Sequence, residues 1–136
     1  MLNKNDIVRL RAHHLLCIEG FEGKGYNREF VENMWHIVDI LNEKSKVMIL
    51  DSCDYICKKC PNKEENICVS PYGGEKQVKK MDRFVIESLN IENNKVYLYG
   101  RLREKVFDVF KTKKSLNGVC FLCSWKRICK WYNSRK

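Results

Sequence analysis

Two stretches of the sequence share one cysteine pattern: Ile56-Cys57-Lys58-Lys59-Cys60-Pro61 runs on to Ile67-Cys68, and Val119-Cys120-Phe121-Leu122-Cys123-Ser124 runs on to Ile128-Cys129. Each stretch has an apolar residue, two cysteines separated by two residues, and a third cysteine preceded by isoleucine. Two thiolates at this spacing can converge on one metal ion across a tight turn. The repeat therefore predicts a domain organised around two cysteine knuckles.

The knuckle cysteines are the predicted metal ligands, because four thiolates complete a tetrahedral zinc site or hold an iron–sulfur cluster. These six are Cys57, Cys60, Cys68, Cys120, Cys123 and Cys129. The alternative is a pair of buried cysteine clusters, or disulfides within each knuckle. That alternative leaves the repeated spacing unexplained, and Lys58 and Lys59 make the first knuckle too polar for a simple core.

The spacing leaves the identity of the metal and the number of sites open. Cys60-Pro61 resembles bacterial ferredoxins, in which a Cys-Pro follows closely spaced ligands, which favours iron–sulfur. Zinc sites use the same Cys-x2-Cys unit, so zinc is the alternative. The 8 cysteines allow two four-thiolate sites if Cys17 and Cys53 complete the knuckles. The other count is a single site that joins Cys57, Cys60, Cys120 and Cys123.

Neither the ends of the chain nor its apolar runs predict a membrane protein. No apolar run approaches the roughly 20 residues that span a bilayer. The polar start and the short run Leu15–Ile18, stopped by Glu19, do not fit a secretory signal. We therefore expect a cytoplasmic protein, in which thiols stay reduced and cysteine patterns bind metal more often than they form disulfides.

The net charge of +9 is concentrated in the second half of the chain. Residues 1–68 contain 10 Lys+Arg and 11 Asp+Glu, whereas residues 69–136 contain 16 and 6, giving −1 and +10. A basic half is typical of nucleic-acid binding. However, lysine, which lacks arginine's bidentate fork, predominates and is spread over predicted helix faces. Nucleic acid is thus a less favoured partner than a redox or other protein partner.

Hydrophobic periodicity predicts a mostly helical α+β domain over residues 1–136. In the first half we expect a helix over residues 9–20, a glycine-bearing loop, a second helix capped by Asn27 and ending near Lys44, and a strand over 47–50. In the second half we expect a turn at Pro71 and Gly73-Gly74, an amphipathic helix to Leu89, a strand over 96–99 and a helix to Phe110. A polar linker over 111–118 and a short closing helix complete the chain.

Two adjacent histidines, His13 and His14, precede Cys17 by four and three residues. On a helix either histidine could share a face with Cys17. Adjacent side chains point about 100° apart, so we do not expect the two histidines to bind the same ion. A His–Cys pair can also act as a nucleophile, which gives an enzyme hypothesis centred on these three residues. The third alternative is that both histidines have a structural role, which is also what we expect of His36.

The opening Arg11-Ala12-His13-His14-Leu15-Leu16-Cys17, followed by Gly20-Phe21-Glu22-Gly23-Lys24-Gly25-Tyr26, resembles a small prokaryotic family, domain of unknown function 1284. The stretch Asp54–Pro61 with Cys68, and Cys120-x2-Cys123-Ser124-Trp125 with Cys129, are similar to its later motifs. The resemblance implies no established activity, and it implies iron–sulfur binding, which is thought to be a property of the family.

The resemblance also bears on the ligand set. An acidic residue or glycine is usual in the family at position 53, which weakens Cys53 as a ligand and favours the six knuckle cysteines, with Cys17 as a seventh candidate. The sequence thus predicts a small cytoplasmic iron–sulfur or metal-binding protein that serves electron transfer or redox sensing. The alternative is a zinc-stapled interaction or nucleic-acid module.

Overall fold

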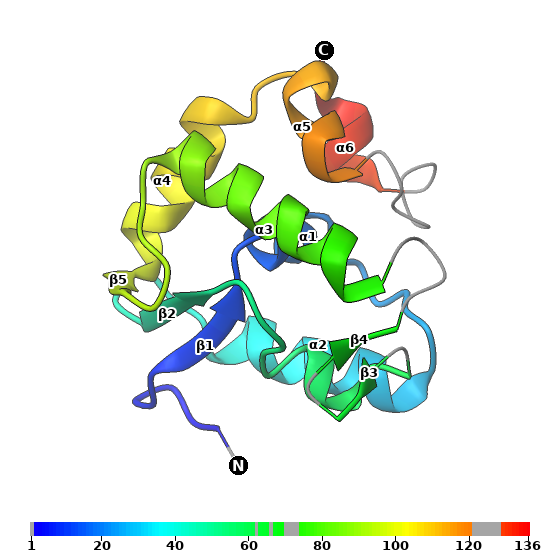
Figure 1. The fold of residues 1–136 in the computed structure, drawn as a ribbon. Helices are drawn as coiled ribbons and strands as arrows, with labels where there is room; N and C mark the ends of the chain where they lie inside the picture. Colours follow the sequence, from blue (N-terminus) through cyan, green and yellow to red (C-terminus); the bar gives the residue numbers. More distant parts are fainter. Residues whose placement is uncertain (1, 62, 66, 70–73, 121–128) are drawn as a thin grey trace.

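A three-stranded sheet lies at one end of the molecule. The computed structural model describes residues 2–61, 63–65, 67–69, 74–120 and 129–136 (Figure 1). The sheet has the order β1 (Val8–Arg11), β2 (Lys46–Leu50), β5 (Val96–Leu98). β1 pairs parallel to β2, with Leu10 opposite Ile49, and β5 pairs antiparallel to β2 on its other side. Alternate residues of β1 and β2 face the core and are at most 1% exposed: Val8, Leu10, Val47 and Ile49.

Two helices connect the parallel strands, as a parallel pair requires. They are α1 (His14–Gly20) and α2 (Arg28–Ile40). Asn27 caps α2, because its side-chain oxygen accepts a hydrogen bond from the backbone N–H of Phe30 at 2.9 Å, which confirms the predicted cap. The apolar face of α2 packs on the core through Met34 and Ile37, and the helix ends earlier than Lys44.

The first cysteine cluster follows β2 as a turn and a small hairpin. The turn is a 3-10 helix, η1 (Cys57–Lys59), and the hairpin pairs β3 (Lys63–Glu64) antiparallel to β4 (Ile67–Cys68). The hairpin places Cys68 opposite Lys63.

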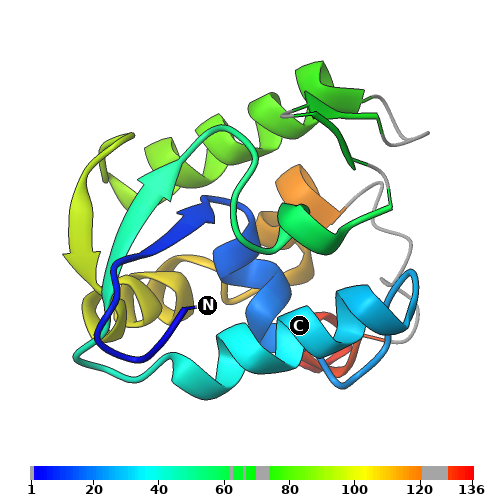
Figure 2. The ribbon, with the colours of Figure 1, turned by 90° about the horizontal axis from the view of Figure 1, so that it is seen from below.

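The second half of the described chain is helical apart from β5. Its helices are α3 (Gly74–Leu89), α4 (Tyr99–Val109), α5 (Lys113–Cys120) and α6 (Lys130–Ser134). In Figure 1, α3 crosses the front of the molecule, and α5 and α6 lie together at the end opposite the sheet. Figure 2 shows α1 in the middle, between α2 and α3. The observed fold confirms a small α+β domain that is mostly helical.

Two segments differ from the sequence-based prediction. Residues 8–11 form a strand instead of the start of a helix, because Val8 and Leu10 alternate toward the core while their backbone pairs with β2. Residues 113–120 form α5 instead of a polar linker, and fully buried Leu116 anchors this helix. No helix in the described part of the chain is long and apolar enough to cross a membrane.

Candidate metal centre

The first knuckle adopts the tight turn that its spacing predicts. The backbone N–H of Cys60 donates to the carbonyl of Cys57 at 3.0 Å, and the N–H of Lys63 donates to the carbonyl of Cys60 at 3.2 Å. The hairpin then brings Cys68 back opposite Lys63. Cys57 is buried, whereas Cys60 and Cys68 are half-buried. The turn and hairpin thus bring all three predicted ligands of this knuckle into one short segment of structure.

The second knuckle is described at its two ends. Cys120 is the last residue of α5 and Cys129 immediately precedes α6, where its sulfur accepts a backbone N–H of that helix at 3.4 Å. This sulfur lies against Gly20, at the end of α1, where any side chain would collide with it. Cys17 is exposed on α1, one turn before Gly20. Cys123 lies outside the described residues.

Possible ligand atoms converge at one place in the described ranges. A ring nitrogen of His14, a carboxylate oxygen of Asp54 and the sulfur of Cys57 all lie within 4.8 Å of one another. We call these three residues the His14 site. No three cysteine sulfurs of the described ranges are gathered as closely, so the all-cysteine ligand sets stay predictions. The sequence singled out Cys57, left His14 open and missed Asp54.

Asp54 joins three segments of the chain. Its Oδ2 accepts the backbone N–H of Arg11 and the Nδ1 of His14, both at 2.7 Å, and its Oδ1 accepts the backbone N–H of Cys57 at 2.9 Å. The Asp54 side chain is fully buried. One carboxylate therefore fixes the end of β1, the start of α1 and the knuckle turn relative to one another.

A second His–Asp pair lies beside the first. The Nδ1 of His13 lies 2.7 Å from Oδ1 of Asp82, on α3, and this oxygen also accepts the backbone N–H of His13 at 3.0 Å. Arg11 donates from Nε to the other oxygen of Asp82 at 2.8 Å and from its two terminal nitrogens to Glu75 at 3.1 and 2.8 Å. We call these four residues, Arg11, His13, Glu75 and Asp82, the Arg11 cluster.

The Arg11 cluster also contacts the first cysteine cluster. Oε1 of Glu75 accepts the backbone N–H of Cys68 at 2.9 Å, and a terminal nitrogen of Arg11 lies 3.9 Å from the sulfur of Cys53. Cys53 in turn shares a side-chain hydrogen bond with Cys57. The two sets of residues therefore form one polar region inside the molecule.

Negative charge predominates in this region. The Arg11 guanidinium binds two carboxylates, Asp82 and Glu75, and a third, Asp54, accepts the backbone N–H of Arg11. Burial lowers the pKa of Arg11, but Glu75 and Asp82 outweigh it and raise that pKa above its ordinary value. Burial alone would raise the pKa of Asp54, but the charge and hydrogen bond of His14, with two backbone N–H groups, hold it below its usual range. Buried charge of one sign is costly unless it is compensated, so the region favours a cation.

The Cys57 thiol is expected to ionise to a thiolate only when such a cation is bound. Burial, and then the nearby Asp54 carboxylate, raise the pKa of Cys57 far above its ordinary value, and burial also raises the pKa of Cys53. Both thiols are therefore protonated at neutral pH in the metal-free protein. A bound metal ion reverses this preference, because a coordinating thiol is deprotonated. Metal binding here is expected to release protons.

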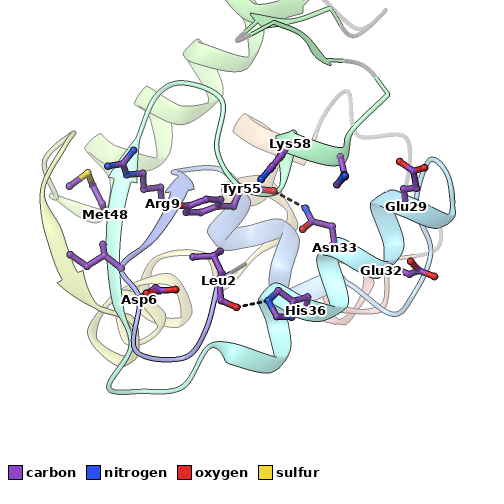
Figure 3. A pocket seen from close by; sticks show the side chains of 12 residues that line it. Leu2, Asp6, Arg9, Glu29, Glu32, Asn33, His36, Met48, Tyr55 and Lys58 are labelled. Atoms are coloured by element: carbon purple, nitrogen blue, oxygen red, sulfur yellow. Dashed lines mark hydrogen bonds between the residues drawn. The ribbon is translucent and has the colours of Figure 1, made fainter.

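A groove of about 860 Å³ is bordered by the knuckle turn, the N-terminal segment and α2 (Figure 3). Tyr55, Lys58 and Lys59 of the turn form part of its lining, and the exposed polar face of α2 lies opposite. Asn33 of α2 donates its side-chain amide to the carbonyl of Tyr55 at 2.7 Å and so fixes this part of the turn. Both signs of charge line the groove, so its electrostatics favour no single class of ligand.

The chain matches a known protein family. The model of the family described as "Protein of unknown function (DUF1284)" matches residues 25–129, well over half of the chain. The matched range contains both cysteine knuckles and begins after the His13-His14 segment. Searches of curated proteins and of solved structures found no match.

Proposed function

Because the chain belongs to the DUF1284 family, whose description assigns no activity, we propose its function from the site itself: the protein binds a metal centre at its first cysteine knuckle. The observation that carries this proposal is the convergence of the buried Cys57 sulfur with His14 and Asp54 in a region of excess negative charge. A buried thiolate beside a buried carboxylate is unfavourable without a cation and favourable with one.

The cofactor that we propose is an iron–sulfur cluster, with zinc as the alternative. Cys57, Cys60 and Cys68 are the thiolates of the first centre, and the tight backbone turn at Cys57–Cys60 and the hairpin that carries Cys68 support this role. A bound cluster would supply one-electron transfer, for exchange with a redox partner or for sensing. Zinc would supply structural stability instead.

A second centre is proposed at the other knuckle, with Cys120, Cys123 and Cys129 as ligands and Cys17 as the fourth. The position of Cys17 supports this assignment. Residues three apart on a helix share a face, so Cys17 lies on the side of α1 that carries Gly20, and the Cys129 sulfur packs there. The first knuckle and the second would then each hold one centre.

Metal analysis of anaerobically purified protein tests the proposal. We expect iron and sulfide with a broad visible absorption band, or zinc in a colourless protein. Cys57→Ala should lose the metal of the first centre, whereas the matched control Cys53→Ala should keep it. Wild-type protein that holds no metal, both as purified and after reconstitution with iron and sulfide or with zinc, would contradict the proposal.

A further inference from the structure

We propose that His14 is the fourth ligand of the first metal centre, through its Nε2, and that Asp54 is the residue that positions it. This inference rests on the proposed function. The centre would then have three thiolates and one imidazole instead of four thiolates. This assignment chooses His14 over its neighbour His13, and it chooses His14 over Cys53 as the fourth ligand.

The hydrogen bond to Asp54 selects the nitrogen. With Nδ1 of His14 donating to the Asp54 carboxylate at 2.7 Å, Nε2 is the ring nitrogen left to offer a lone pair to a metal ion. Within the part of the chain that the structure describes, Nε2 of His14 has no hydrogen-bond partner. Metal-binding histidines almost always donate their second ring N–H to a carboxylate, a backbone carbonyl or water, which fixes the tautomer and the ring orientation.

Asp54 is assigned the positioning role because its oxygens are already engaged. Oδ2 accepts two hydrogen bonds and Oδ1 accepts one, from Arg11, His14 and Cys57. Direct coordination by Asp54 would weaken bonds that hold the ligands His14 and Cys57 in place. The carboxylate therefore serves the centre best by holding both ligands.

His13 makes the same Nδ1–carboxylate contact as His14, but it lies outside the converging group of ligand atoms. Its ring and its backbone N–H both bind Asp82, whose other oxygen is taken by Arg11. The two histidine rings lie 4.3 Å apart between centroids and are tilted by 53°, so they present their nitrogens in different directions. His14 joins the converging group, and His13 does not.

Cys53 is the competing fourth ligand, and its neighbours argue against it. Its sulfur hydrogen bonds with Cys57 but does not join the group that lies within 4.8 Å. It also lies 3.9 Å from the Arg11 guanidinium, and a second cation on the same sulfur would be repelled by the first. For an iron–sulfur cluster, an imidazole in place of a thiolate raises the reduction potential.

Cobalt(II) titration of the reduced, metal-free full-length protein tests the ligand set, because the intensity of the sulfur-to-cobalt absorption reports the number of thiolates. His14→Ala should weaken cobalt binding strongly, whereas Cys53→Ala and the control His36→Ala should leave affinity and spectrum unchanged. His14→Cys should restore binding and raise the charge-transfer intensity of the first centre by about one third, since four thiolates replace three.

Asp54 is tested by a separate pair of variants. Asp54→Ala should weaken cobalt binding ~10–100-fold, the usual effect of losing a carboxylate behind a ligating histidine. Asp54→Asn keeps an acceptor for Nδ1 and should recover part of this loss. A residue needed only for folding would lower the melting temperature of both variants without moving the affinity of the folded fraction.

NMR of the wild-type protein gives a readout that does not depend on any variant folding. Spin-active cadmium should couple to Nε2 of His14 and to no nitrogen of His13 or His36. Loss of binding in Cys53→Ala together with unchanged binding in His14→Ala, or coupling to His13, would overturn this inference and leave the proposed function intact. A wild-type protein that binds none of these metals would overturn the proposed function itself.

Discussion

Two His–Asp pairs stand next to each other at the start of α1, and they differ in what lies beyond the carboxylate. Both have an Nδ1-to-oxygen distance of 2.7 Å and a fully buried aspartate. In the Arg11 cluster, the second oxygen of Asp82 is closed off by Arg11, which is itself held by Glu75. In the His14 site, the second oxygen of Asp54 holds the knuckle turn at Cys57.

The difference shows that one chemical unit can serve two purposes. His13–Asp82 ends in a guanidinium, so its charge is compensated within the protein and the pair stabilises the fold. The second oxygen of Asp54 accepts a backbone N–H, that of Cys57, and no guanidinium, and burial keeps the nearby Cys57 thiol protonated. We therefore expect this carboxylate to contribute to cation binding. The first pair should therefore matter most for stability, and the second for metal affinity.

Asp82→Ala should produce the largest effect, because it leaves the buried Arg11 guanidinium and the His13 backbone N–H without this partner. Removing one member of a buried ion pair costs about 3–5 kcal/mol. Denaturant unfolding measures the change, and Asp39→Ala, at an exposed position of α2, is the matched control. A loss equal to that of the control would show that the Arg11 cluster does not stabilise the fold.

The increase in the free energy of unfolding on zinc binding should distinguish the role of His13 from that of His14. A ligand at 100 times its Kd stabilises the folded state by about 2.7 kcal/mol. His13→Asn should lower stability in the absence of zinc but keep most of this increment, whereas His14→Ala should lose it. Calorimetric melting with and without zinc measures both. Equal increments in the two variants would remove the distinction between the pairs.

Local sequence signals predicted the elements that depend on them. Asn27 and the apolar spacing of α2 gave a correct helix start, and the Cys57–Cys60 spacing gave a correct turn. The strand at Val8–Arg11 was missed because four residues carry too little periodicity to separate from the helix that follows. The helix α5 was missed because only two of its residues, Leu116 and Val119, are buried in an otherwise polar segment.

The contacts within the polar region could not be predicted from a single sequence, for a different reason. Arg11 meets Glu75 and Asp82 across 64 and 71 residues, and His14 meets Asp54 across 40. An isolated arginine or aspartate has no local pattern that distinguishes it from a surface residue. Cysteine spacing singled out Cys57 as a candidate ligand, whereas the contact between Asp54 and His14 follows from tertiary structure.

Arg11→Lys should have a smaller effect than loss of Asp82, because the positive charge remains while the forked geometry is lost. A lysine cannot make both the Nε bond to Asp82 and the two-pronged bond to Glu75. We expect a loss of about 1.5 kcal/mol, the contribution of a hydrogen bond to a charged group. Urea unfolding measures it, with the exposed Arg101→Lys as control. Equal stability of Arg11→Lys and wild type would show that charge alone holds the cluster.

Mild acid should give the smallest effect and should sharpen the contrast at His13. Burial, and then the charge of His14, lower the pKa of His13 below its ordinary 6.5. Between pH 7 and 6 the His13 side chain therefore takes up a proton more readily in the unfolded chain than in the folded protein. Stability must then fall as the pH falls, by up to about 0.7 kcal/mol over this unit.

The carboxylates do not contribute in this window. The pKa values of Asp54 and Asp82 are also lowered, burial being outweighed by the histidines, so their stabilisation is lost only below the unfolded value of 3.8. Unfolding of the metal-free protein at pH 7 and 6 measures the contribution of His13 to stability, and His13→Asn should flatten the dependence of stability on pH. An unchanged slope in that variant would assign the proton to another group and separate the pH response from the Arg11 cluster.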